Sequence, residues 1–95
     1  MHDYELVTII SPEIDEERIS SIIDELDKFI SDRGGIVDKM DNWGKRKLAY
    51  PIKRFMEGNY VLTRFKLEPK LTKEVEAKVK TSEEVLRHLV VKVRD

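Results

Sequence analysis

The 95-residue sequence lacks several features on which common functions depend. It contains no cysteine, which excludes disulfides, thiolate metal sites and cysteine nucleophiles and fits a reducing compartment. No hydrophobic run approaches the ~18 apolar residues that a membrane helix needs. The acidic N-terminal residues do not form the basic segment of a signal peptide. We therefore expect a cytoplasmic protein without a membrane partner.

Motifs for catalysis, metal binding and phosphate binding are missing as well. The two histidines, His2 and His88, are far apart in the sequence, and no H-E-x-x-H helix, EF-hand loop or G-x-x-x-x-G-K-[ST] loop occurs. None of the serines lies in the glycine-flanked turn that exposes a catalytic serine. We expect no enzymatic activity, no metal, no cofactor and no small-molecule substrate.

The net charge of −1 conceals a strong asymmetry along the chain. Residues 1–41 hold four Lys/Arg against twelve Asp/Glu and so carry −8, whereas residues 42–95 hold fourteen against seven and carry +7. Such a division is typical of a basic region that binds a partner. The alternative is that the charges only decorate solvated helix faces.

The hydrophobic pattern predicts one domain, residues 1–95, with four strands and two helices. Asp15 is the expected N-cap of the first helix, and Gly34 lies where a left-handed residue ends a helix. Glu57–Asn59 has the composition of a turn before the third strand. The expected strands are Tyr4–Ile10, Ile36–Ile52 with an interruption near residues 42–44, Tyr60–Leu67 and Leu86–Val93, and the second helix carries Leu71, Val75 and Val79.

This order of elements defines the expected fold class. With right-handed crossovers it gives an α+β, ferredoxin-like βαββαβ fold, in which both helices cover one face of a four-stranded antiparallel sheet. The other face stays uncovered. Alternation along the strands predicts its residues: Val7 and Ile9, or else Leu6 and Ile10, beside Leu62 and Arg64. An apolar uncovered face on a small domain favours a protein partner.

Two clusters of cationic residues lie in the second half of the chain. Lysine and arginine neutralise phosphates and release counterions, so both clusters are candidate RNA sites. Basic residues on an edge strand also prevent sheet aggregation, which is the alternative explanation. The second and fourth strands are the expected edges, so we expect the clusters to lie apart. They comprise Lys45, Arg46, Lys47, Lys53 and Arg54 in and after the second strand, and Arg87, His88, Lys92 and Arg94 in and after the last.

Strand alternation divides the first cluster. It places Arg46 on the side opposite to its two lysine neighbours. Three apolar residues after it share one side and are expected in the core: Leu48, Tyr50 and Ile52. For Tyr50 we favour packing over stacking on a base. His88 is expected to be a packed or edge histidine, because no second metal ligand is near it in the sequence.

The RNA-recognition motif shares this topology and stacks bases on aromatic residues of its central strands. The expected third strand carries Tyr60 and Phe65, which have opposite parity and cannot both belong to one stacking platform. The sequence therefore does not predict that mode of RNA binding.

Several segments resemble the family of the bacterial small-subunit ribosomal protein S-six (S6), over essentially the whole chain. The most specific is the run W-G-K-R-K-L-A-Y-P-I at residues 43–52. The other segments are Tyr4-Glu5, Pro12, Gly34-Gly35, Gly58-x-Tyr60 and the final run V-L-R-H-L-V-V-K at residues 85–92.

The resemblance implies a ferredoxin-like fold and a structural, non-catalytic role in the small ribosomal subunit. It implies binding to central-domain ribosomal RNA together with ribosomal protein S-eighteen (S18). His2 and Lys47 stand where the family often has arginine, which would weaken phosphate contacts. By position, the resemblance implies RNA contacts from Arg46, Lys47, Arg87 and Lys92. With the neighbouring cationic residues, the predicted RNA-binding set is His2, Lys45, Arg46, Lys47, Lys53, Arg87, His88 and Lys92.

Two other functions compete with the ribosomal one. A stand-alone interaction or regulatory ligand-binding domain would bind through the uncovered sheet face. A small phosphatase of this topology would need a glycine-rich anion loop with an arginine after the first strand. Here residues 11–15 form an acidic segment without glycine or arginine, which would repel phosphate.

Overall fold

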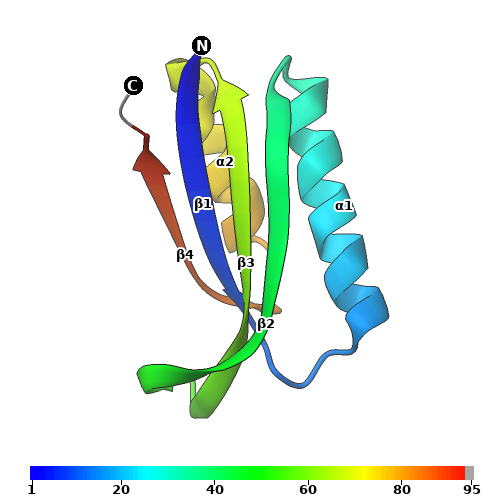
Figure 1. The fold of residues 1–95 in the computed structure, drawn as a ribbon, viewed down its shortest axis with the longest axis vertical. Coiled ribbons are helices and arrows are strands. Elements are labelled where there is room, and N and C mark those ends of the chain that lie inside the picture. The colour runs from blue at the N-terminus through cyan, green and yellow to red at the C-terminus, as the bar shows by residue number, and fades with distance from the viewer. Residues whose placement is uncertain (94–95) are drawn as a thin grey trace.

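The computed structural model describes residues 1–93 and has the expected element order (Figure 1). The first helix and the second strand begin and end close to where the sequence predicts them. A short 3-10 turn, Pro69–Leu71, leads into the second helix. The elements are β1 (His2–Ile10), α1 (Glu16–Asp32), β2 (Ile36–Ile52), β3 (Phe55–Leu67), α2 (Thr72–Lys80) and β4 (Val85–Lys92).

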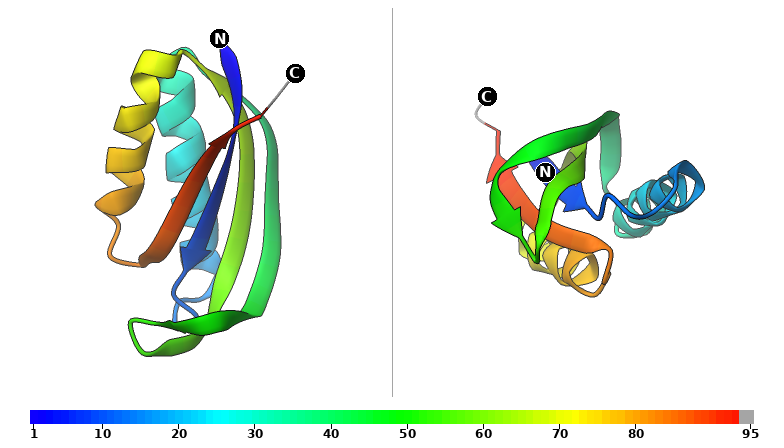
Figure 2. Two further views of the ribbon diagram at one scale, coloured as in Figure 1. Left: turned by 90° about the vertical axis from the view of Figure 1, so that its left-hand side faces the viewer. Right: turned by 90° about the horizontal axis from the view of Figure 1, so that it is seen from below.

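The four strands form one antiparallel sheet in the order β2-β3-β1-β4, and α1 and α2 lie on one face of it (Figure 2). Strands β2 and β4 are therefore the edges, as expected. The predicted ferredoxin-like fold is confirmed.

The core lies between the sheet and the helices. Alternate residues of the two central strands face it, with Leu6 and Phe65 fully buried. The stripe of apolar residues on α1 packs against them, with Ile19 and Ile30 buried. Val7, Ile9, Leu62 and Arg64 therefore belong to the uncovered face. The first of the two alternatives for this face is the correct one.

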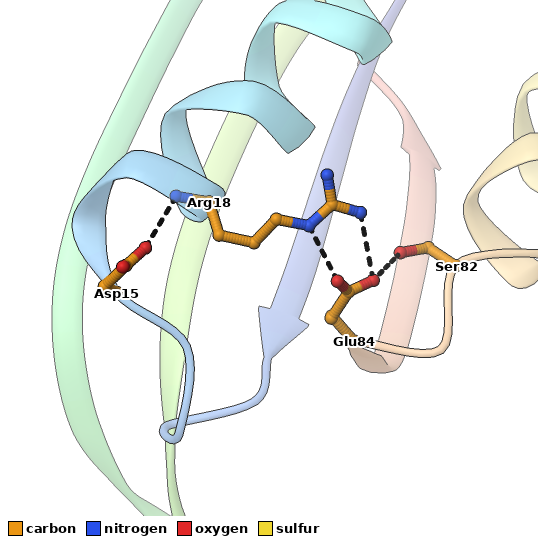
Figure 3. A network of polar contacts seen from close by, with 4 residues as sticks. All are labelled: Asp15, Arg18, Ser82 and Glu84. Atoms are coloured by element: carbon orange, nitrogen blue, oxygen red, sulfur yellow. Dashed lines mark hydrogen bonds and ion pairs between the residues drawn. The ribbon is translucent and has the colours of Figure 1, made fainter.

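The start of α1 is fixed by side-chain hydrogen bonds that also reach the other end of the chain (Figure 3). The Asp15 carboxylate accepts a hydrogen bond from the Arg18 backbone N–H at 2.9 Å, as the predicted N-cap requires. The Arg18 guanidinium donates two hydrogen bonds to Glu84, at 2.7 and 3.2 Å, and Ser82 donates a third. These contacts join α1 to the loop between α2 and β4.

The hairpin between β2 and β3 differs from the prediction. Glu57–Asn59 does not form the turn. It lies inside β3, which begins at Phe55, and the turn consists of Lys53 and Arg54. Gly58 is needed there because a Cβ atom at this position would lie 2.5 Å from Cγ2 of Ile9. The glycine therefore belongs to a strand and not to a turn, and it leaves room for the side chain of Ile9 on the neighbouring strand.

Candidate nucleic-acid interface

The β2–β3 hairpin ends in a two-residue turn with unusual backbone angles. Lys53 and Arg54 have φ values of 49° and 75°, and the strands close across the pair Ile52–Phe55. Such hairpin turns need positive φ at both central residues and normally use asparagine or glycine. Two long cationic side chains in this conformation cost stability, and they place two charges at the tip of the hairpin.

The outer part of the hairpin bends across the lower end of the sheet toward β4 (Figures 1 and 2). Two irregularities in the β2–β3 pairing, at 42–44 and 47–52, accompany this bend. The bend brings Tyr50 of β2 to Arg87 of β4. Arg87 donates a hydrogen bond to the Tyr50 hydroxyl, and its guanidinium lies 5.7 Å from the centre of the ring.

This contact corrects two expectations. Tyr50 does not pack in the core, because its side chain is 54 % exposed, whereas its neighbour Leu48 is buried as expected. The two cationic clusters start from opposite edges of the sheet, but the bent hairpin brings them together at Tyr50 and Arg87. Strand alternation could not predict this, since a bulge shifts the parity of every residue that follows it.

Trp43 adds a second exposed aromatic side chain close to the hairpin. Its ring is stacked on Tyr60, with the centres 6.5 Å apart and an interplanar angle of 14°. The Arg46 guanidinium lies 5.4 Å from the centre of the Trp43 ring. Phe65 is buried on the other face, as its parity predicted. Parity within β3 does not predict this pair, because Trp43 lies on β2 and Tyr60 on β3.

A hollow of about 310 Å³ lies between the hairpin and the sheet. Tyr50, Leu48 and Ile52 of β2 form one side of it. Ile9 of β1 and Tyr60 of β3 are among the residues of the other side, and β4 contributes Arg87, His88 and Leu89. The lining is mainly apolar and aromatic and contains no carboxylate.

Within residues 1–93, the cations of the outer part of the hairpin and Arg87 form no ion pair with a carboxylate. Lys45, Arg46, Lys47, Lys53, Arg54 and Arg87 are all exposed. Over residues 1–93, none of the ion pairs within 4.0 Å includes any of these six side chains. Those ion pairs are Arg18–Glu84, Arg33–Glu74, Lys39–Asp41, Lys66 with Asp3 and Asp38, His88–Glu76, and the N-terminus with Glu68. The hairpin end therefore carries an excess of positive charge that is available to an anionic partner.

The remaining predicted RNA-binding residues lie elsewhere. His2 and Lys92 lie at the opposite end of the sheet, near each other across β1 and β4, since Lys92 pairs with Tyr4. His88 is mostly buried, and its Nε2 atom is 3.6 Å from Glu76 of α2. Its imidazole therefore contacts α2, although the residue also lines the hollow beside Arg87. Arg94 lies outside the described residues.

The uncovered face of the sheet presents apolar side chains beside this cationic end. Leu89 and Val91 of β4 are 61 % and 46 % exposed. Val7 and Leu62 lie on the same face and are half-buried. On a domain of this size, such a surface is typical of a protein interface.

The described residues have no candidate metal site and no candidate membrane helix, but they form a second, larger hollow. Residues 1–93 contain no cluster of three or more His, Asp or Glu side chains that could hold a metal ion. No helix among them is both long and apolar enough to cross a membrane. A larger groove of about 710 Å³ lies between α1 and α2, with Leu26, Val79 and Glu84 among its lining residues.

The fold places the chain among the ferredoxin-like α+β domains, here with an uncovered apolar face and a cationic hairpin. Comparison with known proteins narrows this class. The family model for ribosomal protein S6 matches residues 3–92, and the chain belongs to this family. It is therefore a protein of the small ribosomal subunit, which is cytoplasmic.

Individual members of the family can be aligned with this chain over nearly its whole length. The small ribosomal subunit protein bS6 of Clostridioides difficile is 43 % identical over 91 residues, covering 96 % of this chain and 98 % of the relative. The protein of the same name from Desulforamulus reducens is 37 % identical over 92 residues, covering 97 % of both. The crystal structure of 30S ribosomal protein S6 from Thermotoga maritima is 31 % identical, with a TM-score of 0.92 over 97 % of this chain and 87 % of that one.

Proposed function

We propose that this chain binds the central domain of small-subunit ribosomal RNA together with ribosomal protein S18, as a structural component without catalytic activity. The observation that carries the proposal is the excess of unpaired cations that the bent hairpin gathers around Arg87. Family membership gives the ribosomal context.

The RNA part of the proposal rests on electrostatics. Lysine and arginine side chains that are exposed and free of carboxylates can neutralise RNA phosphates at little desolvation cost. Lys45, Arg46, Lys47, Lys53 and Arg87 of the predicted set meet this condition, and the strand pairing places them at the same end of the sheet. His2 and Lys92 lie at the other end, and we assign them a secondary contact.

The protein part rests on the uncovered sheet face. Leu89, Val91, Val7 and Leu62 form an apolar surface that is continuous with the cationic end through Arg87. We therefore assign S18 to this face, and we expect the two proteins to bind RNA more tightly together than either does alone.

The test is to measure affinity for a central-domain RNA fragment with and without S18. Affinity should be weak and salt-sensitive for the chain alone and should rise when S18 is present. Arg87→Ala should lower the affinity and reduce the slope of log affinity against log salt by about one. Lys73→Ala, which removes an exposed charge from α2, is the matched control and should change neither.

An affinity that responds neither to S18 nor to Arg87→Ala would contradict this mechanism. Self-association of the purified chain without any RNA binding would favour the stand-alone interaction domain instead.

A further inference from the structure

The hollow between the hairpin and the sheet is a recess with apolar and aromatic walls, whereas phosphate binding requires only exposed cations. Its volume of about 310 Å³ is at the lower end of the range found for small-molecule pockets. Leu48 on one side is 6 % exposed, whereas Tyr50 beside it is 54 % exposed. The hollow therefore has a packed floor and an accessible aromatic wall.

The position of Tyr50 is held from two sides. Pro51 follows it and fixes its own φ, so the backbone at this point is restricted. On the other side, the Arg87 guanidinium donates a hydrogen bond to the Tyr50 hydroxyl and contacts the ring. These contacts restrict the Tyr50 side chain, so the ring would lose less conformational entropy when a ligand stacks on it than an unrestrained side chain would.

The chemistry of the lining selects the ligand class. Aromatic and aliphatic groups favour a flat apolar group, and the absence of carboxylates among the described lining residues leaves Arg87 available to bind an anion attached to that group. A nucleotide combines a flat base with a phosphate. Stacking of an unpaired base on an aromatic side chain is a common mode of RNA recognition.

We propose that this hollow, which we call the hairpin pocket, binds one unpaired base of an RNA strand. Tyr50 and Tyr60 supply the aromatic surface for the base, and Arg87 binds the adjoining phosphate. The inference deepens the proposed RNA-binding function and rests on it. It adds a base-stacking contact to a site for which only cationic contacts were predicted.

The test compares two substitutions of one residue. Tyr50→Leu keeps an apolar side chain but removes the ring, and it should weaken binding of the central-domain RNA fragment, with S18 present, about 5- to 150-fold, the range for the loss of one stacked base. Tyr50→Phe keeps the ring and should recover most of that loss. Ile36→Ala changes an exposed residue at the start of β2, at the opposite end of this strand from Tyr50. It is the control and should bind like the unaltered chain.

A second measurement identifies the contact directly. Ultraviolet cross-linking of the complex with RNA and S18 should join Tyr50 or Tyr60 to an unpaired nucleotide.

A third measurement separates RNA binding from protein binding. The affinity of S18 for the chain in the absence of RNA should be unchanged by Tyr50→Leu.

The possible failures are distinguishable. If RNA binds normally and Tyr50→Leu has the affinity of the unaltered chain, the hairpin pocket is wrong and the RNA-binding function stands. If Tyr50→Leu weakens the complex with S18 in the absence of RNA, the pocket holds a side chain of the protein partner and the base-binding proposal is overturned. If the unaltered chain binds no RNA, both proposals fail together.

Discussion

At the scale of single residues, the Arg18–Glu84 pair connects two segments that are far apart in the sequence (Figure 3). Hydrogen bonds from Arg18 lower the pKa of Glu84 from 4.5 to about 2, although partial burial acts in the opposite direction. The folded state thus favours the ionised form of Glu84. This contribution to stability is present at neutral pH and is lost in acid.

We expect Glu84→Gln to lower the midpoint of thermal unfolding by a few degrees at pH 7. Because the pKa of Glu84 is depressed in the folded state, the difference should be constant above about pH 5 and should shrink as the pH falls from 4.5 to about 2. Unfolding of both proteins should be followed by circular dichroism across this pH range. Glu83→Gln, at the exposed neighbouring position, should show no such difference. An effect of Glu84→Gln that persists unchanged at pH 2 would contradict the assignment.

Residues governed by local rules could be predicted from the sequence. Asp15 caps α1 because a short acidic side chain precedes a helical pattern, and Gly34 ends the helix region with φ at 80°. Tyr50 could not be predicted, because its exposure depends on irregular pairing between β2 and β3. The same limit applies to Trp43, whose partner Tyr60 lies on the neighbouring strand.

At the scale of secondary-structure elements, the β2–β3 hairpin is where prediction and structure differ most. The sequence correctly predicted β2 as Ile36–Ile52 and placed an interruption near Gly44, which has φ at 79°. It missed the turn because Lys53 and Arg54 are poor turn formers with positive φ, whereas Glu57–Asn59 has turn composition. Positions that adopt an unfavourable conformation often serve a function, and here the two cationic side chains extend the candidate RNA site.

Replacing Lys53-Arg54 by Asn-Gly should therefore separate stability from RNA binding. Asn and Gly adopt positive φ angles at a lower steric cost than Lys and Arg do. The free energy of unfolding, measured by denaturant titration, should therefore rise by about 1–2 kcal/mol. Loss of two charges should weaken RNA binding and reduce the salt slope by up to about two. The control, Lys53→Ala with Arg54→Ala, should weaken binding without the gain in stability. A variant with Asn-Gly that binds RNA as before would exclude the hairpin tip from the interface.

At the scale of the whole molecule, the two charge halves of the sequence interleave in one sheet. The acidic half contributes β1, α1 and the first residues of β2, while the basic half contributes the bent part of the hairpin, α2 and β4, and β1 lies between β3 and β4. The fold class followed from the order and periodicity of the elements, and the S6 resemblance from the W-G-K-R-K-L-A-Y-P-I run. That run identified the family more securely than it located the interface, because Arg87 joins it only in three dimensions.

We infer that this chain is an RNA-bound component of the small ribosomal subunit, held largely by the cations of the hairpin and of β4. Sedimentation of a cell lysate through a sucrose gradient tests it most directly. The chain should co-migrate with small subunits at low salt and dissociate from them at high salt. The Arg87→Ala variant should dissociate at a lower salt concentration than the unaltered chain. Migration as a free protein at low salt, or co-migration that neither salt nor Arg87→Ala weakens, would contradict the account.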